Sequence, residues 1–280
     1  MIKLGAPLFQ DYVSPEEWVS LLKENGYGAA YAPISYERIS QAGSYRRAAS
    51  DAGIIISEVG SWSNPLSADE EERTEALSRC KNNLALAEEL GARCCVNIAG
   101  SRGEKWDGPH PANLADETFD MVVDTVREII DAVEPKETSY ALEPMPWIFP
   151  HTADSYRDLL EAVDREAFAV HLDPVNVVSS PSKFYYNGEL IGEWFQKLGD
   201  WVISCHAKDI VLRERLTVHL DEVVPGEGGL DYPRYLVEID ELDGDTPLMV
   251  EHLESEEDYE RAVSHIRSVA EGEGVNISSA

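Results

Sequence analysis

Short apolar runs alternate with longer amphipathic stretches along the whole chain. Eight of the apolar runs are bounded by turn residues and have the length of β-strands. They are Ile2–Ala6, Ala29–Ala32, Ile54–Val59, Cys94–Ala99, Ser139–Glu143, Ala167–Asp173, Trp201–Lys208 and Pro247–Glu251. Because an amphipathic stretch separates these strands, we expect them to be parallel and joined by helical crossovers.

Helix start signals stand between the predicted strands. The segment Ser14-Pro15-Glu16-Glu17 is a capping box with proline at the first helical position. Three more pairs give the same kind of signal, namely Ser67 with Glu70, Asn113 with Asp116, and Ser255 with Asp258. The clearest helical stretches are Glu71–Leu90, Glu117–Ala132, Ala153–Val163 and Glu256–Ala270.

Loop lengths favour a closed barrel over an open sheet. The turns from helix to strand are short, as at Asn25-Gly26, whereas the loops from strand to helix are long, as in the segment Asp209–Gly229. Long loops on one side only are typical of a (β/α)8 TIM barrel. The alternative, a doubly wound sheet, would carry a glycine-rich phosphate turn after its first strand, and Leu4-Gly5-Ala6-Pro7 is not one. We expect a single-domain α/β TIM barrel over residues 1–270 and a flexible C-terminal tail at 271–280.

The charge of the chain narrows the choice of partners. The sequence holds 53 acidic and 23 basic residues, a formal net charge of −30. Such a surface repels phosphate backbones and anionic lipids, so we expect neither nucleic-acid nor membrane binding. The acids are spread along the chain and only eight lysines occur. Because salt screens such self-repulsion, we expect a saline cytoplasm, as in a halophile, with an ordinary acidic protein as the alternative.

The ends and the cysteines point to the cytoplasm. The N-terminal MIKLGAPLFQDY lacks the long apolar run of a secretory signal. No run of about 18 apolar residues is present that would span a membrane. The four cysteines form no CxxC pair, and adjacent Cys94 and Cys95 would point to opposite faces of a strand. We expect a cytoplasmic protein with reduced thiols.

Ionisable residues lie at or near the C-terminal ends of four consecutive predicted strands. They are Glu143, Asp173, His206 and Glu251. Three carboxylates that converge at one barrel mouth repel one another, and a divalent cation removes that repulsion. Three carboxylates and one imidazole suit Mn²⁺ or Mg²⁺ best, with Co²⁺ or Zn²⁺ as alternatives. One such residue alone would be no more than a helix cap, so the prediction rests on all four together.

The segments around these residues resemble the xylose isomerase-like TIM-barrel superfamily of sugar phosphate isomerases and epimerases. The matching segments are ALEPMPW with Glu143, VHLDPVN with Asp173, CHAKDI with His206, PGEGGLDY at Pro225–Tyr232, and VEHL with Glu251. The resemblance covers nearly the whole chain. It implies that the four residues bind one divalent metal and that Glu143 and Glu251 form the acid/base pair that moves a substrate proton.

Isomerisation, or epimerisation next to a ketone, removes a proton α to a carbonyl. A metal that holds the carbonyl oxygen stabilises the enediolate, and carboxylates on opposite sides of the substrate can remove and return the proton. We therefore expect a metal-dependent isomerase or epimerase of a small sugar or polyol. An inosose dehydratase-like lyase is the first alternative, and a non-catalytic sugar-binding barrel is a remote one.

Further residues are candidates for substrate contact. Lys208 shares the strand face of His206, and His171 shares that of Asp173 one step deeper. The remaining candidates lie at a strand end or in loops after strands, and are Asn176, Glu58, Trp62 and Trp147. For each there is a structural alternative, such as a hydrogen-bonded core histidine, a cap or ordinary loop packing. His252 is expected to face away from its neighbour Glu251.

Two positions depart from the ketose 3-epimerases of the superfamily. Those enzymes typically carry a glutamate where this chain has Phe149 and a histidine where it has Asn176. Both differences disfavour a free-ketohexose 3-epimerase. A phosphate-binding cradle is not evident, although Arg213 and Arg215 stand in the loop after the seventh strand. A homodimer is an open alternative, since barrels of this kind often pair.

Overall fold

Eight parallel strands form a nearly closed barrel in this computed structural model, which describes residues 1–242 and 244–278. In pairing order the strands are β1 (Ile2–Gly5), β10 (Thr246–Val250), β7 (Val202–Ala207), β6 (Phe168–Leu172), β5 (Ser139–Leu142), β4 (Cys94–Asn97), β3 (Ile55–Gly60) and β2 (Ala29–Tyr31). The first and last strands of this order also lie in contact. All eight predicted strands are present, and the single-domain TIM barrel is confirmed.

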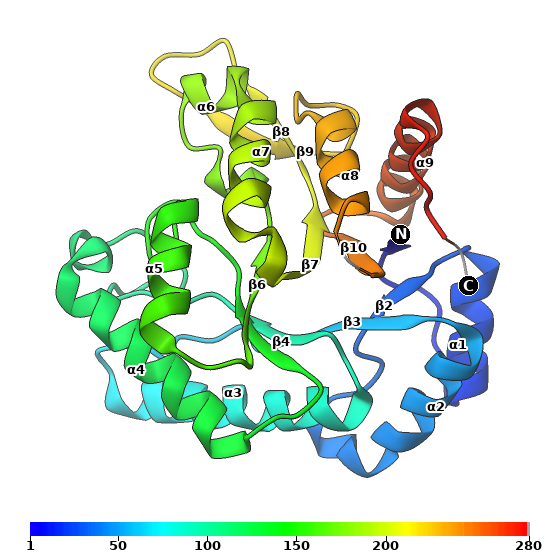
Figure 1. Ribbon diagram of the computed structural model, residues 1–280, viewed down its shortest axis with the longest axis horizontal. Helices are drawn as coiled ribbons and strands as arrows, with labels where there is room; N and C mark the ends of the chain where they lie inside the picture. Colours follow the sequence, from blue (N-terminus) through cyan, green and yellow to red (C-terminus); the bar gives the residue numbers. More distant parts are fainter. Residues whose placement is uncertain (243, 279–280) are drawn as a thin grey trace.

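Helices surround the strands in chain order (Figure 1). The α-helices are α1 (Pro15–Glu24), α2 (Ala42–Ala52), α3 (Glu70–Leu90), α4 (Asp116–Val133), α5 (Ala153–Val163), α6 (Pro181–Tyr185), α7 (Asn187–Leu198), α8 (Tyr232–Asp240) and α9 (Glu256–Glu273). Short 3₁₀ turns lie at Tyr36–Gln41, Pro111–Leu114, Val175–Val177 and Gly199–Trp201. Apolar residues at helical spacing face the core, as Val122, Val126 and Ile129 do in α4.

Two of the four predicted start signals cap their helices. The Ser14 hydroxyl accepts a hydrogen bond from the Glu17 amide, and Ser255 does the same for Asp258. The signal at Ser67 was wrong, because the helix begins three residues later. There the Asp69 carboxylate accepts the amides of Glu71 and Glu72.

The signal at Asn113 was also wrong. Helix α4 follows Ala115, which has no capping side chain. The Asn113 amide instead holds the long loop after β4, where its oxygen accepts the Arg102 amide and its nitrogen donates to the Gly108 carbonyl. A turn-forming residue near a helix start therefore stabilises the loop rather than the helix.

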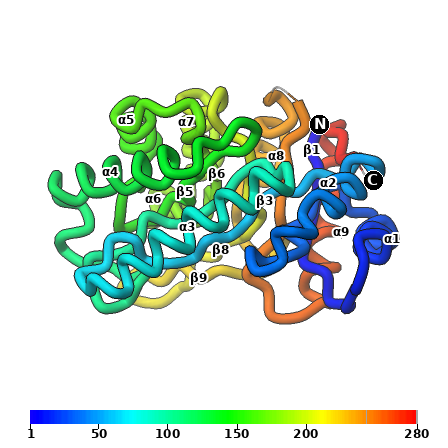
Figure 2. The backbone as a smooth tube through the Cα atoms, turned by 90° about the horizontal axis from the view of Figure 1, so that it is seen from below, coloured from blue at the N-terminus to red at the C-terminus, as the bar shows by residue number. Residues whose placement is uncertain are grey.

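The segment after residue 270 continues the fold. Helix α9 runs to Glu273, and Ile277 forms a parallel bridge with Ile2 of β1. The Ile2 amide donates to the Asn276 carbonyl, and the Ser278 amide donates to the Ile2 carbonyl. Figure 2 shows the red C-terminal stretch on the same side of the molecule as β1. The expected domain boundary at 270 thus falls within a helix, and residues 279–280 lie outside the described residues.

The loop expected at Asp209–Gly229 contains two strands that the sequence pattern did not predict. Strands β8 (Asp209–Leu212) and β9 (Leu220–Val223) form an antiparallel hairpin. The Asp209 carboxylate accepts the amides of Gly226, Gly228 and Leu230, and so holds the returning chain. A Cβ at Gly228 would lie 2.3 Å from Asp209 Oδ1, so only glycine allows this approach.

Small side chains fill the inside of the barrel. Cys94, Val96 and Ala141 form a separate buried cluster, with Ile203 packed against it. Cys94 Sγ lies 3.3 Å from Ser204 Oγ, whereas Cys95 belongs to the larger core between strands and helices. The two adjacent cysteines therefore face opposite sides of β4, as predicted. All four cysteines are free and buried.

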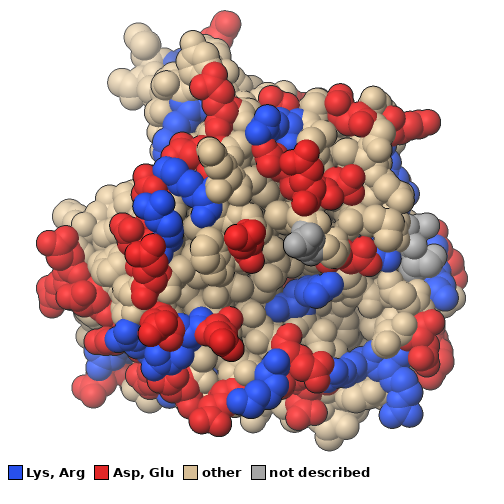
Figure 3. Space-filling model, in the orientation of Figure 1, with Lys and Arg blue, Asp and Glu red and all other residues tan. Residues whose placement is uncertain are grey.

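Acidic side chains cover the molecule broadly. Figure 3 shows Asp and Glu over all parts of the visible face, with Lys and Arg between them. Among residues 1–242 and 244–278, no helix has both the length and the apolar character needed to cross a bilayer.

Candidate metal centre

Four side chains from neighbouring strands meet at the carboxyl end of the barrel. They are Glu143 after β5, Asp173 after β6, His206 in β7 and Glu251 after β10. One ligand atom of each lies within 4.8 Å of the other three. Because parallel strands end on the same side of a barrel, residues far apart in the chain converge here.

His206 and Lys208 provide the positive charge of this cluster. His206 Nδ1 lies 2.8 Å from Glu251 Oε1 and 3.3 Å from Glu143 Oε1. Lys208 Nζ lies 2.7 Å from Glu251 Oε1 and 2.8 Å from Asp173 Oδ2. All five side chains are buried or nearly so. The two basic groups therefore balance part of the charge of three carboxylates in a water-poor environment.

The donor set fits a divalent cation. Within the described part of the chain, no hydrogen-bond donor is aligned on Asp173 Oδ2 or Glu251 Oε1, even though Lys208 is near both. Buried carboxylate oxygens without aligned donors are costly unless a cation binds them. Three carboxylates and one imidazole nitrogen offer the mainly oxygen ligands that Mn²⁺ and Mg²⁺ favour.

Burial and neighbouring charges shift the protonation of the cluster. Burial opposes ionisation of Glu143, but the Lys208 ammonium and His206 outweigh it and lower the pKa of Glu143 to about 2. Burial raises the pKa of Asp173 to about 7, although Lys208 opposes the rise. Burial also disfavours charged His206, yet the carboxylates around it, Glu251 first, raise its pKa well above its ordinary value. Without a cation, the cluster therefore retains protons at neutral pH.

Asn176 and the two predicted tryptophans lie at the cavity above this cluster. The cavity has a volume of about 970 Å³ and is lined by Asn176, Trp62 and Trp147 together with Glu143 and Glu251. Asn176 Nδ2 donates to Glu143 Oε1 over 2.9 Å, and Trp147 Nε1 donates to the Asp107 carbonyl over 2.8 Å. These residues are placed where a bound molecule would contact them.

Glu58 and His171 do not line this cavity, although Glu58 lines a neighbouring one of about 570 Å³ together with Trp62 and Glu251. Glu58 reaches His206 from β3, with its carboxylate 3.3 Å from Nε2. His171 Nδ1 lies 2.6 Å from Ser204 Oγ inside the barrel. His171 is thus hydrogen-bonded through Nδ1, whereas its buried Nε2 has no hydrogen-bond partner among the described residues. Both side chains are buried, with exposed fractions of 2% for Glu58 and 0% for His171.

Two cavity residues were missed or misplaced by the sequence pattern. Glu222 of β9 lines the cavity, 3.8 Å from Lys208 Nζ, and belongs to the hairpin that was not predicted. His252 was expected to face away from Glu251, but it lines the same cavity and its Nδ1 lies 3.1 Å from Glu222 Oε2. Its backbone turns to a φ of 59°, and this ends the strand alternation on which the expectation was based.

The sequence profile of the xylose isomerase-like TIM barrel family matches residues 17–269. The chain belongs to this family. No curated protein matches the sequence. The profile spans the strands that carry all four clustered residues, so the family assignment and the geometry concern the same part of the chain.

Solved structures share the family fold at low sequence identity. The probable 3-DHS dehydratase AsbF from Bacillus anthracis is 16% identical with a TM-score of 0.69, covering 96% of this chain and 99% of that one. The 3-keto-D-glucoside 4-epimerase YcjR from E. coli is 15% identical, with a TM-score of 0.67 and coverages of 96% and 100%. A xylose isomerase-like TIM barrel protein from Mycobacterium smegmatis in complex with magnesium is 17% identical, with a TM-score of 0.63 and coverages of 93% and 90%.

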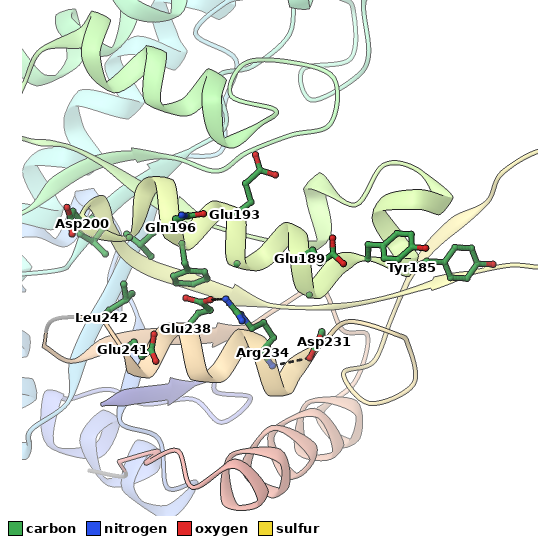
Figure 4. Close-up of a pocket in the computed structure, with 17 residues that line it drawn as sticks. Tyr185, Glu189, Glu193, Gln196, Asp200, Asp231, Arg234, Glu238, Glu241 and Leu242 are labelled. Atoms are coloured by element: carbon green, nitrogen blue, oxygen red, sulfur yellow. Dashed lines mark hydrogen bonds and ion pairs between the residues drawn. The ribbon is translucent and has the colours of Figure 1, made fainter.

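Another cavity lies away from the clustered residues. It measures about 1410 Å³ and lies on the outside of the barrel, between α7 and α8. Figure 4 shows that Glu189, Glu193 and Glu238 line it, with Arg234 beside Glu238. In this family fold the active site lies at the carboxyl ends of the strands. The smaller cavity above the cluster is therefore the functional candidate.

Proposed function

We propose that the protein is a divalent-metal-dependent isomerase or epimerase that moves a proton next to the carbonyl of a sugar-like substrate. The observation that carries this proposal is the convergence of four ligand atoms within 4.8 Å at the floor of a cavity. Membership of the xylose isomerase-like family and the likeness to a 4-epimerase support it.

One divalent ion would be held by the set Glu143, Asp173, His206 and Glu251, with Mn²⁺ or Mg²⁺ as the first choice. A magnesium complex of a protein with the same fold supports this choice. When bound, such an ion acts as a Lewis acid on a substrate oxygen. Lys208 stays beside the ligands, where its ammonium can hold a second substrate oxygen.

Glu143 and Glu251 are the proposed proton acceptor and donor. Each lines the cavity, and the pKa of each is lowered because Lys208 and His206 outweigh the effect of burial. An ionised carboxylate is the form that accepts a proton. The two residues follow β5 and β10, with β6 and β7 between them in the barrel, so they approach a substrate from different directions. Either one fits the role of base.

The cavity favours an uncharged substrate. Its walls include the indoles of Trp62, Trp106 and Trp147, which suit the apolar face of a sugar ring. Its two lysines are paired with carboxylates, Lys105 with Asp107 over 2.9 Å and Lys208 with Asp173 over 2.8 Å, and no arginine is among the described residues that line it. Arg213 pairs with Asp221 over 3.0 Å, and Arg215 lies 3.0 Å from His219 Nδ1. We therefore propose a non-phosphorylated sugar or polyol.

A metal-dependent lyase is the second candidate. The likeness to a probable dehydratase favours it, because loss of water and epimerisation both begin with removal of a proton α to a carbonyl.

We also propose that the protein is located in a saline cytoplasm. The acids spread over the face seen in Figure 3 and the four free, buried cysteines support this location.

The test is a panel of keto-sugars, keto-polyols and their phosphates, incubated with enzyme and Mn²⁺ in D₂O. Solvent deuterium in an isomeric product supports the isomerase or epimerase, and a product lighter by one water supports the lyase. We expect turnover of an unphosphorylated substrate. If no member of the panel takes up deuterium or loses water, the proposed proton transfer is wrong.

A further inference from the structure

Glu58 reaches across the inside of the barrel to His206. It lies on β3, whereas His206 lies on β7, and the two strands are not neighbours in the sheet. Both carboxylate oxygens of Glu58 are 3.3 Å from His206 Nε2. Both side chains are almost completely buried, with exposed fractions of 2% and 0%. A carboxylate so deep in a barrel needs a hydrogen-bond donor, and His206 provides it.

The two ring nitrogens of His206 face different partners. Nδ1 points to the candidate ligands Glu143 and Glu251, at 3.3 and 2.8 Å, whereas Nε2 points to Glu58. A neutral imidazole carries one proton, and only the nitrogen without it can bind a cation. If Nδ1 binds the ion, the proton must be on Nε2, where the Glu58 carboxylate accepts it. The geometry thus matches a carboxylate–histidine–metal arrangement.

Glu58 has a second potential role as a ligand of its own. One ligand atom each of Glu58, His171 and His206 also lie within 4.8 Å of one another. In this second set His171 Nδ1 is 3.8 Å from Glu58 and is engaged by Ser204 Oγ at 2.6 Å, which leaves Nε2 as the ring nitrogen without a partner among the described residues. However, occupation of this second set would require His206 Nε2 to lose the proton that it donates to Glu58. The contacts therefore favour a hydrogen bond over a second ion.

We propose that Glu58 is a positioning residue: its hydrogen bond from His206 Nε2 orients the imidazole so that Nδ1 faces the divalent ion. This inference rests on the proposed metal site. It differs from the expectation that Glu58 binds a substrate hydroxyl. Glu58 does not line the cavity above the ligands, although it lines a neighbouring cavity of about 570 Å³ with Trp62 and Glu251, and its carboxylate is directed to His206 Nε2. Loss of such an outer partner typically weakens metal binding by about 10- to 100-fold.

The test measures Mn²⁺ affinity by competition with a chelator, without any substrate. Glu58→Leu removes the acceptor, and we expect the dissociation constant to rise by about 10- to 100-fold. Glu58→Gln keeps an acceptor oxygen but loses the charge, and we expect a smaller rise, of roughly threefold or more, since charge-assisted hydrogen bonds are the stronger ones. The visible spectrum of the Co²⁺ form should change in both variants, because the orientation of a ligand changes.

Glu88→Gln is the matched control, because the Glu88 carboxylate accepts backbone amides at Lys136, Glu137 and Thr138, far from the ligands. It should lower the melting temperature and leave the Mn²⁺ affinity unchanged. If Glu58→Leu does not fold, the test rests on Glu58→Gln, whose side chain has the same size as that of the wild type. A wild-type Mn²⁺ affinity in Glu58→Gln overturns the proposal. Two ions per chain, with one lost in a Glu58 variant, would also overturn it. If the wild-type protein itself binds no divalent ion, the proposed function fails instead.

Discussion

The Lys208 ammonium lies 2.8 Å from Asp173 Oδ2, on the cavity floor where the candidate ligands converge. It is also 2.7 Å from Glu251 Oε1 and 3.6 Å from Glu143 Oε1. One internal cation therefore faces the three carboxylates that a divalent ion would bind. Because like charges repel, this lysine stabilises the ion-free protein and opposes the ion.

Lys208→Met should have opposite effects on folding and on metal binding. Removing one partner of a buried ion pair costs about 3–5 kcal/mol, so the ion-free variant should unfold at a lower temperature. Its affinity for Mn²⁺ should rise, while turnover falls because a substrate contact is lost. Calorimetry and chelator competition check the two effects. Lys197→Met is the control, since Lys197 pairs with Glu193 and Asp154 on the outer surface. Weaker Mn²⁺ binding by Lys208→Met would contradict the view that the lysine opposes the ion.

Metal affinity should increase with pH through neutrality. The pKa of buried Asp173 is raised to about 7, and the carboxylates around His206 raise its pKa as well despite its burial. Below these values both groups hold protons that a cation must displace, so binding weakens as the pH falls. We expect the release of about one to two protons per ion near pH 7. Titration calorimetry in two buffers of different ionisation enthalpy measures this number, and a value of zero would exclude these protonation states.

Glu251→Gln should abolish the reaction and weaken metal binding. The amide retains the size of the side chain but neither accepts a proton nor supplies charge, and loss of an acid/base group costs about 10²–10⁴ in rate. Turnover and Mn²⁺ affinity are the two measurements. Glu254→Gln, an equal change at an exposed position three residues away, should leave both unchanged. Wild-type turnover in Glu251→Gln would remove this residue from the mechanism.

Thermal stability should depend strongly on salt. A formal charge of −30 spread over the surface produces self-repulsion, which dissolved ions screen. We expect the melting temperature to rise as KCl is increased from about 0.1 to 3 M, because the Debye length falls to roughly 3 Å at 1 M. A constant melting temperature over this range would favour an ordinary acidic protein, without any consequence for the metal site.

The strands and the four clustered residues were predictable because both follow from patterns of neighbouring residues in the sequence. An apolar run that ends in Glu143 or Asp173 places the carboxylate at a strand end, and parallel strands bring such ends together. His252 shows the limit of this argument, since a backbone φ of 59° just after Glu251 breaks the alternation of sides.

Contacts across the barrel were not predictable in the same way. The pairing of Glu58 with His206 depends on how strongly the strands tilt and stagger in the barrel. The spacing of residues in the sequence does not determine this tilt and stagger. The β8–β9 hairpin was missed because its strands have four residues each and the seven residues 213–219 between them exceed a tight turn. Glu222 was missed with it.

The β8–β9 hairpin and the barrel strands supply different parts of the cavity. The clustered acids and His206 belong to barrel strands or follow them directly, whereas Val218, Leu220 and Glu222 reach the cavity from the hairpin between β7 and α8. Asp209 anchors the hairpin at its base by accepting the amides of the returning chain. Mutations along the hairpin would therefore change the wall of the cavity and leave the clustered residues in place, so the shape of the cavity can vary independently of the candidate ligands.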